Sequence, residues 1–187
     1  YNEWTFDALE DSRGNIWVAC SWGLSLLKKG EDVFRIFTNQ PGDSSSLSDS
    51  YINCLYEDSG GYIWVGTING LNRYNHSTNT FTDFSKKLES KYICSIQEDF
   101  EGNIWVSTLG GISKVSPKTK RVSNYTASEG IRSGEFFPRS SYRDAEKHLY
   151  FGGSNGLEIL NPKEVISKSN NQRIEINVNV AELNNGV

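Results

Sequence analysis

Apolar residues in this chain fall in short runs that alternate with turns rich in Asp, Gly and Asn. Runs of this length, rich in β-branched and aromatic residues and bounded by turn residues, predict β-strands. The pattern is clearest in the middle of the chain, where four strands are predicted: Ile52–Tyr56, Tyr62–Thr67, Leu71–Tyr74 and Thr80–Phe84. Tight turns between them predict a four-stranded antiparallel sheet.

The same arrangement is predicted three more times. Before the central sheet, strands are expected at Thr5–Glu10, Ile16–Cys20, Leu24–Leu27 and Val33–Phe37. After it, they are expected at Ile93–Glu98, Ile104–Thr108, Ile112–Val115 and Arg121–Tyr125. A last group is expected at Arg139–Arg143, His148–Gly152 and Leu157–Leu160.

This pattern arises from a repeated sequence motif. It reads Asp-x-x-Gly-x-Ile-Trp, then five residues, then Gly-Leu or Gly-Ile. The spacing from one Asp to the next is 47, 41 and 45 residues. A strand-rich period of about 40 to 50 residues is typical of β-propeller blades. Residues that recur in every copy are interpreted as structural: Asp11, Gly14, Trp17, Gly23, Asp58, Gly61, Trp64, Gly70, Asp99, Gly102, Trp105, Gly111, Asp144, Tyr150 and Gly156.

The predicted fold is therefore all-β, a β-propeller segment of four four-stranded antiparallel blades. It occupies residues 1–165, with blades at about 1–50, 51–91, 92–137 and 138–165. In the fourth copy Lys147 replaces the turn Gly, so that turn is expected to differ, because a non-Gly residue at positive φ costs about 1 kcal/mol. Residues 166–187 are predicted to be a linker followed by one strand. That strand is either the outer strand of the fourth blade or, as we favour, the first strand of a following β-sandwich.

Composition narrows the function classes. The net charge of −4 argues against a nucleic-acid partner, which usually requires a basic surface. No run of about 18 apolar residues indicates a membrane span, and no secretory signal peptide is visible. The absence of Met, even at position 1, indicates a piece of a longer protein.

The three cysteines, Cys20, Cys54 and Cys94, form no Cys-x-x-Cys pair, and the chain has only two histidines. Neither a metal site nor a cofactor is expected. Cys20 and Cys54 are interpreted as small buried residues.

Candidate chemistry is sought among residues that belong to one blade alone. The acidic pairs Glu10-Asp11, Glu57-Asp58 and Glu98-Asp99 recur in three blades, so they are interpreted as turn builders and not as acid–base catalysts; the recurring tryptophans are interpreted as core. Ligand binding is expected on the inter-blade loops Thr38–Ser50, Ser85–Lys91 and Thr126–Pro138 and on neighbouring turns. The segment Pro41–Ser46 is interpreted as a flexible, solvated stretch without chemistry of its own. The candidate ligand-binding residues, suited to a carbohydrate, are Trp22, Asn69, Glu135, Arg139 and Arg143.

The repeat resembles the two-component regulator propeller repeat over residues 5 to 160. The resemblance lies in Glu57-Asp58 to Gly61, Ile63–Thr67 and Gly70–Tyr74, and in their counterparts. The ending, Leu149–Leu157 followed by Asn161-Pro162, resembles the last blade in the periplasmic sensor of Bacteroides-type hybrid two-component systems. That family implies a following Y_Y_Y β-sandwich, a membrane span, a histidine kinase, a receiver and a DNA-binding domain, and it implies sensing of glycan breakdown products. The resemblance therefore implies a periplasmic location, in an inner-membrane protein.

Three functions remain open. The first is a non-catalytic sensor segment that recognises an oligosaccharide or transmits its binding. The second is a stand-alone glycan-binding or scaffold propeller. The third is part of a propeller glycosidase or lyase, which needs two blade-specific acids, whereas Glu135 alone stands out. Because family propellers have seven or more blades, four blades are expected to leave open faces and to self-associate, for instance as two arcs in an eight-bladed ring.

Overall fold

The computed structural model describes residues 4–166. Fifteen strands form four antiparallel sheets in chain order. The first contains β1 (Thr5–Glu10), β2 (Ile16–Cys20), β3 (Gly23–Leu27) and β4 (Arg35–Phe37). The second contains β5 (Ile52–Glu57), β6 (Ile63–Thr67), β7 (Gly70–Asn75) and β8 (Thr80–Asp83). The third contains β9 (Ile93–Glu98), β10 (Ile104–Thr108), β11 (Gly111–Val115) and β12 (Val122–Tyr125).

The fourth sheet has three strands, β13 (Phe136–Arg143), β14 (Leu149–Gly153) and β15 (Gly156–Leu160). The short helix α1 (Pro162–Ile166) follows it, and two 3-10 turns, Ser85–Lys87 and Ala127–Glu129, lie in the inter-blade loops. The strand expected within residues 174–180 lies outside the described residues. Among residues 4–166, no helix is long and apolar enough to cross a membrane.

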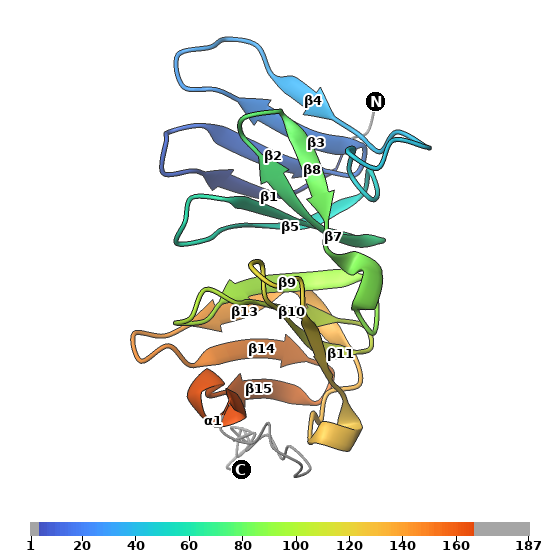
Figure 1. Ribbon diagram of the computed structural model, residues 1–187, viewed down its shortest axis with the longest axis vertical. Coiled ribbons are helices and arrows are strands. Elements are labelled where there is room, and N and C mark those ends of the chain that lie inside the picture. Colours follow the sequence, from blue (N-terminus) through green and yellow to red (C-terminus); the bar gives the residue numbers. More distant parts are fainter. Residues whose placement is uncertain (1–3, 167–187) are drawn as a thin grey trace, which may run out of the picture.

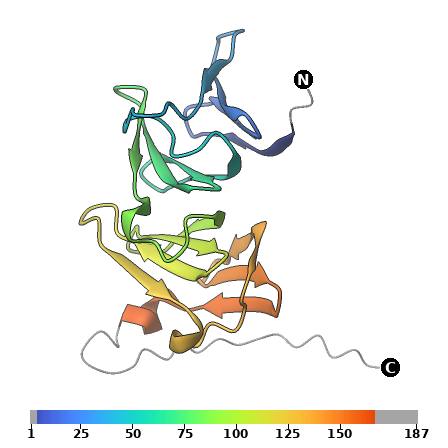
Figure 2. The ribbon, with the colours of Figure 1, turned by 90° about the vertical axis from the view of Figure 1, so that its right-hand side faces the viewer.

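The sheets follow one another as the blades of a β-propeller, which confirms the predicted fold class. The inner strands β1, β5, β9 and β13 lie next to one another in the middle of the molecule (Figure 1). The first and fourth blades extend from them toward opposite ends, and the strands β7 and β8 of the second blade lie toward the viewer (Figures 1 and 2). The described chain is thus an arc of blades, with a sheet face at each end.

The core lies between neighbouring blades and comprises three clusters of buried side chains. The tryptophans Trp17, Trp64 and Trp105 are each 0% exposed, and each lies in a different cluster. Trp17 packs with Ile63 and Tyr74 of the second blade. Burying large aromatic side chains is the main stabilising contribution of such an interface.

The turn of the fourth copy does not differ from the others, so that prediction was wrong. Lys147 adopts φ 72°, close to the 79° of Gly14. Its N–H donates to the Asp144 carbonyl at 3.1 Å, as that of Gly14 donates to Asp11 at 2.8 Å. The repeat geometry therefore holds a lysine in the left-handed region.

The cysteines are free in the structure. Cys54 and Cys94 are buried, and burial raises the pKa of both thiols, that of Cys94 to about 12. Cys20 is only half-buried, because its side of the first blade has no neighbouring blade in the described part of the chain. Such protonated core thiols are poor nucleophiles.

Candidate functional site

The repeated aspartates are used in turns that fix the adjacent strands. In the first blade the Asp11 carboxylate accepts hydrogen bonds from the N–H groups of Arg13 and Asn15 and from the Trp17 indole at 2.8 Å. The equivalent indole bonds reach Asp58 at 2.7 Å and Asp99 at 2.9 Å. Burial acts to raise the pKa of Asp11, but the hydrogen bonds outweigh it and the pKa is lowered. Asp11 therefore stays charged, and all three carboxylates are occupied by hydrogen bonds within their own turns, which is unsuited to proton transfer.

The glutamate before each aspartate connects neighbouring blades. Glu57 accepts from the Ser12 N–H at 2.9 Å and from its hydroxyl at 2.6 Å. Glu98 accepts in the same way from Ser59, at 2.9 and 2.7 Å. We call each Ser–Glu pair an inter-blade latch. The acidic pairs of the repeat thus serve the turn and the blade interface.

Two of the predicted ligand residues lie on turns between the second and third strands of their blades. Trp22 lies between β2 and β3 and is 69% exposed. Asn69 lies between β6 and β7, where its N–H donates to the Thr67 hydroxyl at 3.1 Å. Glu135 is exposed in the loop before β13, and its carbonyl accepts from Ser154 N–H of the neighbouring turn. These three residues therefore share the edge of the blades on which the inter-blade loops lie.

Arg139 and Arg143 lie on β13 and have structural contacts. Arg139 adopts φ 60° at an irregularity of the strand, donates to the Asn53 carbonyl at 3.0 Å, and lies 5.6 Å from the centre of the Phe6 ring. It thereby connects the inner strands of three blades. Arg143 is the last residue of β13, where it donates to the Glu98 carbonyl at 2.8 Å and pairs with the Glu98 carboxylate at 3.7 Å. The structure does not bring Arg143 together with Trp22, Asn69 and Glu135.

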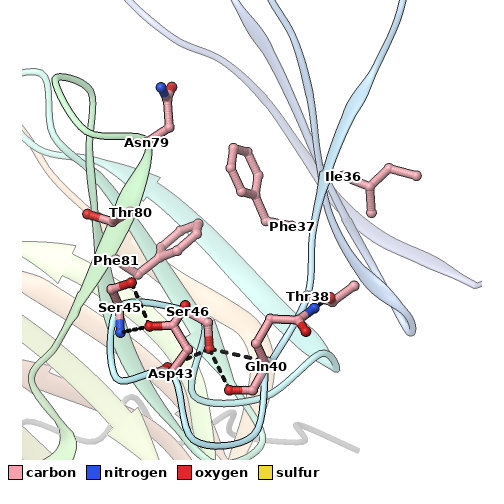
Figure 3. Close-up of a pocket in the computed structure, with 10 residues that line it drawn as sticks. All are labelled: Ile36, Phe37, Thr38, Gln40, Asp43, Ser45, Ser46, Asn79, Thr80 and Phe81. Atoms are coloured by element: carbon pink, nitrogen blue, oxygen red, sulfur yellow. Dashed lines mark hydrogen bonds between the residues drawn. The ribbon is translucent and has the colours of Figure 1, made fainter.

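A small cavity of about 210 Å³ lies between the first two blades (Figure 3). Phe37 of β4 and Phe81 of β8 form its apolar sides. Gln40 and Asp43 contribute polar groups from the inter-blade loop, and Asn79 contributes one from the hairpin before β8. Pockets for drug-sized ligands measure about 300–1,000 Å³, so this one has room for a single sugar ring or a similar small polar molecule.

The loop beside this cavity is held by local hydrogen bonds. The Asp43 carboxylate accepts from the Ser45 N–H at 2.8 Å and hydroxyl at 2.7 Å, and these bonds lower its pKa. The Ser46 hydroxyl donates to the Asp43 carbonyl at 2.9 Å, and Leu47 is 1% exposed in the core. The segment Pro41–Ser46 was predicted to be flexible and solvated. Residues 41–44 are exposed, and the Ser45 carbonyl accepts from the Phe81 N–H of the second blade at 2.7 Å, in addition to the local hydrogen bonds of serine and aspartate.

Among residues 4–166, no three His, Cys, Asp or Glu side chains gather as a metal site. The cavity residues Asn79 and Phe81, which lie in a hairpin, were not predicted from the sequence. The usable signal was an asparagine in a polar hairpin loop, because Asn adopts positive φ more readily than most residues, as Asn79 does at φ 54°.

Comparison with known proteins agrees with the repeat geometry. Residues 46–69 and 87–110 match the family model described as "Two component regulator propeller". Two segments of this chain thus match the two-component regulator propeller. No curated protein matches the chain.

Solved structures share the fold. The extracellular domain of BT3049, titled a hybrid two component system of B. thetaiotaomicron, matches with a TM-score of 0.74 and 21% identity, over 97% of this chain and 25% of the other. That of BT4673 of the same organism matches with a TM-score of 0.72 and 23% identity, over 85% and 24%. Virginiamycin B lyase of Staphylococcus aureus matches with a TM-score of 0.65 and 13% identity, over 85% and 53%. The chain thus spans about a quarter of the two extracellular domains, and at these identities the likeness shows the fold alone.

Proposed function

We propose that this chain is part of the extracytoplasmic sensor of a hybrid two-component signalling protein, and that it recognises an oligosaccharide or transmits its binding. In such a protein the sensor lies in the periplasm and a kinase lies beyond a membrane span. The chain itself then performs no reaction.

The observation that carries this proposal is the joint match of repeat and fold. Two segments match the two-component regulator propeller, and the most similar folds include extracellular domains of hybrid two-component systems. The fold also resembles a lyase, but a shared propeller supports many unrelated functions. The carboxylates of the repeated turns are bound within the blades, which favours a binding role over a catalytic one.

The sensor role is tested by reading the coding sequence that follows Val187. The proposal expects a β-sandwich of the Y_Y_Y type, one apolar span of about 20 residues and a kinase with its phosphoacceptor histidine. A stop codon shortly after Val187 contradicts the sensor and leaves a stand-alone glycan-binding or scaffold propeller. Saccharide binding by that shorter protein, measured on a glycan array, then separates a lectin from a scaffold.

A further inference from the structure

Two positions at which single blades depart from the repeat carry exposed aromatic side chains. The first follows the turn glycine. Asn15 and Asn103 occupy it in the first and third blades, and each side-chain amide donates to the aspartate of its own turn, at 2.9 and 3.0 Å. In the second blade the position holds Tyr62, which is 44% exposed. Tyr62 therefore does not serve the turn as the asparagines do.

The second departure follows the turn aspartate. Ser12 and Ser59 occupy this position in the first two blades and form the inter-blade latches. In the third blade it holds Phe100, which is 45% exposed and has no hydroxyl to donate. The Nζ of Lys163 in α1 lies 5.7 Å from the centre of its ring. A large aromatic residue has thus replaced a structural serine at a surface position.

Both departures line one cavity. It measures about 480 Å³ and lies between the β5–β6 turn of the second blade and the β9–β10 turn of the third, beside the β11–β12 turn. We call it the blade 2–3 groove; Tyr62, Phe100, Arg73, Glu101 and Lys118 are among its lining residues. Its volume suits a ligand of one to three sugar rings, since it falls within the range of small-molecule pockets. Exposed aromatic faces in such a groove are suited to the C–H surfaces of sugars.

The charged groups of the groove indicate the sign of the ligand. The Arg73 guanidinium lies 4.6 Å from the centre of the Tyr62 ring and 5.4 Å from that of Phe84. Among residues 4–166 it has no carboxylate or carbonyl partner, and neither has Lys118. Both cations are therefore positioned at the groove with unused donors.

The acidic side chains of the groove are already engaged. Asp58 accepts from Gly60 and Tyr62 N–H and from Trp64, Glu98 accepts from Ser59, and Glu101 pairs with Lys114 at 3.9 Å. A guanidinium binds a carboxylate through two parallel hydrogen bonds. We infer that the blade 2–3 groove binds an acidic saccharide, with the sugar rings on Tyr62 and Phe100 and a sugar carboxylate on Arg73 and Lys118. This inference names the ligand class of the proposed function, and it rests on the oligosaccharide binding proposed there.

The repeat supplies variants that the fold already tolerates. Tyr62→Asn and Phe100→Ser restore the residues of other blades, and Arg73→Leu introduces the residue of the first blade, Leu26, which occupies the same register position opposite the tryptophan. Phe34→Ala is the matched control, because it removes an exposed aromatic side chain of the first blade that does not line the groove. Trp22→Ala tests the opposite edge of the blades, where three of the predicted ligand residues lie. Circular dichroism and thermal unfolding verify that each variant keeps the fold.

Isothermal titration calorimetry with trigalacturonate and with neutral galactotriose tests the inference. We expect the uronate to bind and the neutral sugar to bind at least about ten-fold more weakly. Tyr62→Asn and Arg73→Leu each weaken uronate binding about ten-fold or more, Arg73→Lys weakens it less, and Phe34→Ala leaves it unchanged.

Three results overturn the inference. Uronate binding that survives Tyr62→Asn and Arg73→Leu but is lost in Trp22→Ala moves the site to the other edge and leaves the oligosaccharide function intact. Neutral sugar binding as tight as uronate binding shows that the groove does not select acidic saccharides. Absence of binding to both sugars shows that the groove is not a saccharide site, whereas the sensor role is decided separately by the coding sequence after Val187.

Discussion

At the residue scale, the motif predicts which side chains hold a blade together but not the tolerance of single positions. Asp, turn Gly and Trp were interpreted as structural, and the bond from indole to carboxylate gives a physical reason for their recurrence. The fourth copy has Tyr150 in place of the tryptophan and keeps an equivalent bond, because the Tyr150 hydroxyl donates to Asp144 at 2.9 Å. Sequence alone could not show that Lys147 keeps the turn, because the outcome depends on whether strand pairing outweighs about 1 kcal/mol of backbone strain.

Lys147 is the residue whose substitution tests that strain. Its side chain is exposed and its φ is 72°, so Lys147→Gly removes an unfavourable conformation without removing a buried contact. We expect the free energy of unfolding to rise by about 0.5–1 kcal/mol. Lys147→Ala is the control, because alanine keeps the strained φ and is expected to gain little. Urea denaturation of the three proteins gives the comparison, and equal stability of the Gly and Ala variants would contradict the explanation.

At the element scale, strand order and pairing were predictable, whereas strand ends and the groove were not. The β13 strand begins at Phe136, three residues before the predicted start, because Phe136 pairs with Gly153 across an irregularity that contains Arg139. The outer strand β4 is shorter than predicted, beginning at Arg35 instead of Val33. Tyr62 and Phe100 were not among the predicted ligand-binding residues. They line one groove although they are 38 positions apart in the sequence, because their turns lie on adjacent blades.

The inter-blade latch is an element-scale contact that can be measured. Ser12 donates two hydrogen bonds to the Glu57 carboxylate, and both residues lie outside the blade 2–3 groove. A double-mutant cycle with Ser12→Ala and Glu57→Gln measures the hydroxyl bond, because the backbone N–H of residue 12 remains in the alanine variant. A coupling energy of about 1 kcal/mol is expected, since this bond is charge-assisted but partly solvated. Additive effects of the two substitutions on the free energy of unfolding would show that the hydroxyl bond of the latch does not stabilise the fold. Ser128→Ala combined with Glu57→Gln supplies the non-contacting control pair.

At the scale of the whole molecule, the two end blades present faces that are covered elsewhere in the chain. Ile63 and Val65 of the second blade are 0% exposed, whereas their counterparts in the first blade, Ile16 and Val18, are half-buried. Ile36 of the same blade is 66% exposed. Large exposed apolar faces of this kind tend to pair with another surface.

An incomplete latch in the first blade and an exposed aromatic residue in the fourth blade support the same conclusion. Glu10 occupies the position of Glu57 and Glu98, yet its carboxylate has no hydrogen-bond or ion-pair partner among residues 4–166. At the other end of the arc, Tyr142 is 64% exposed, and its counterpart Tyr56 is packed against the core between the second and third blades. The first blade therefore offers a vacant acceptor, and the fourth offers an uncovered apolar face.

We propose that two copies of the chain form a dimer, with the fourth blade of each packed against the first blade of the other. Such pairing was expected from the number of blades in the chain. Two such contacts related by a two-fold axis close a ring of eight blades, a size known for propellers.

Sedimentation equilibrium is expected to give twice the 21.0 kDa mass of the chain. Ile36→Glu and Tyr142→Glu, one at each end of the arc, are expected to shift the protein to monomer, because each places a charge in an apolar contact. Leu109→Glu, which alters an exposed turn of the third blade, is the control expected to remain dimeric. A wild-type protein that stays monomeric across the micromolar range would show that the end faces do not pair with a second copy, and a dimer that survives both end-face variants would place its interface elsewhere.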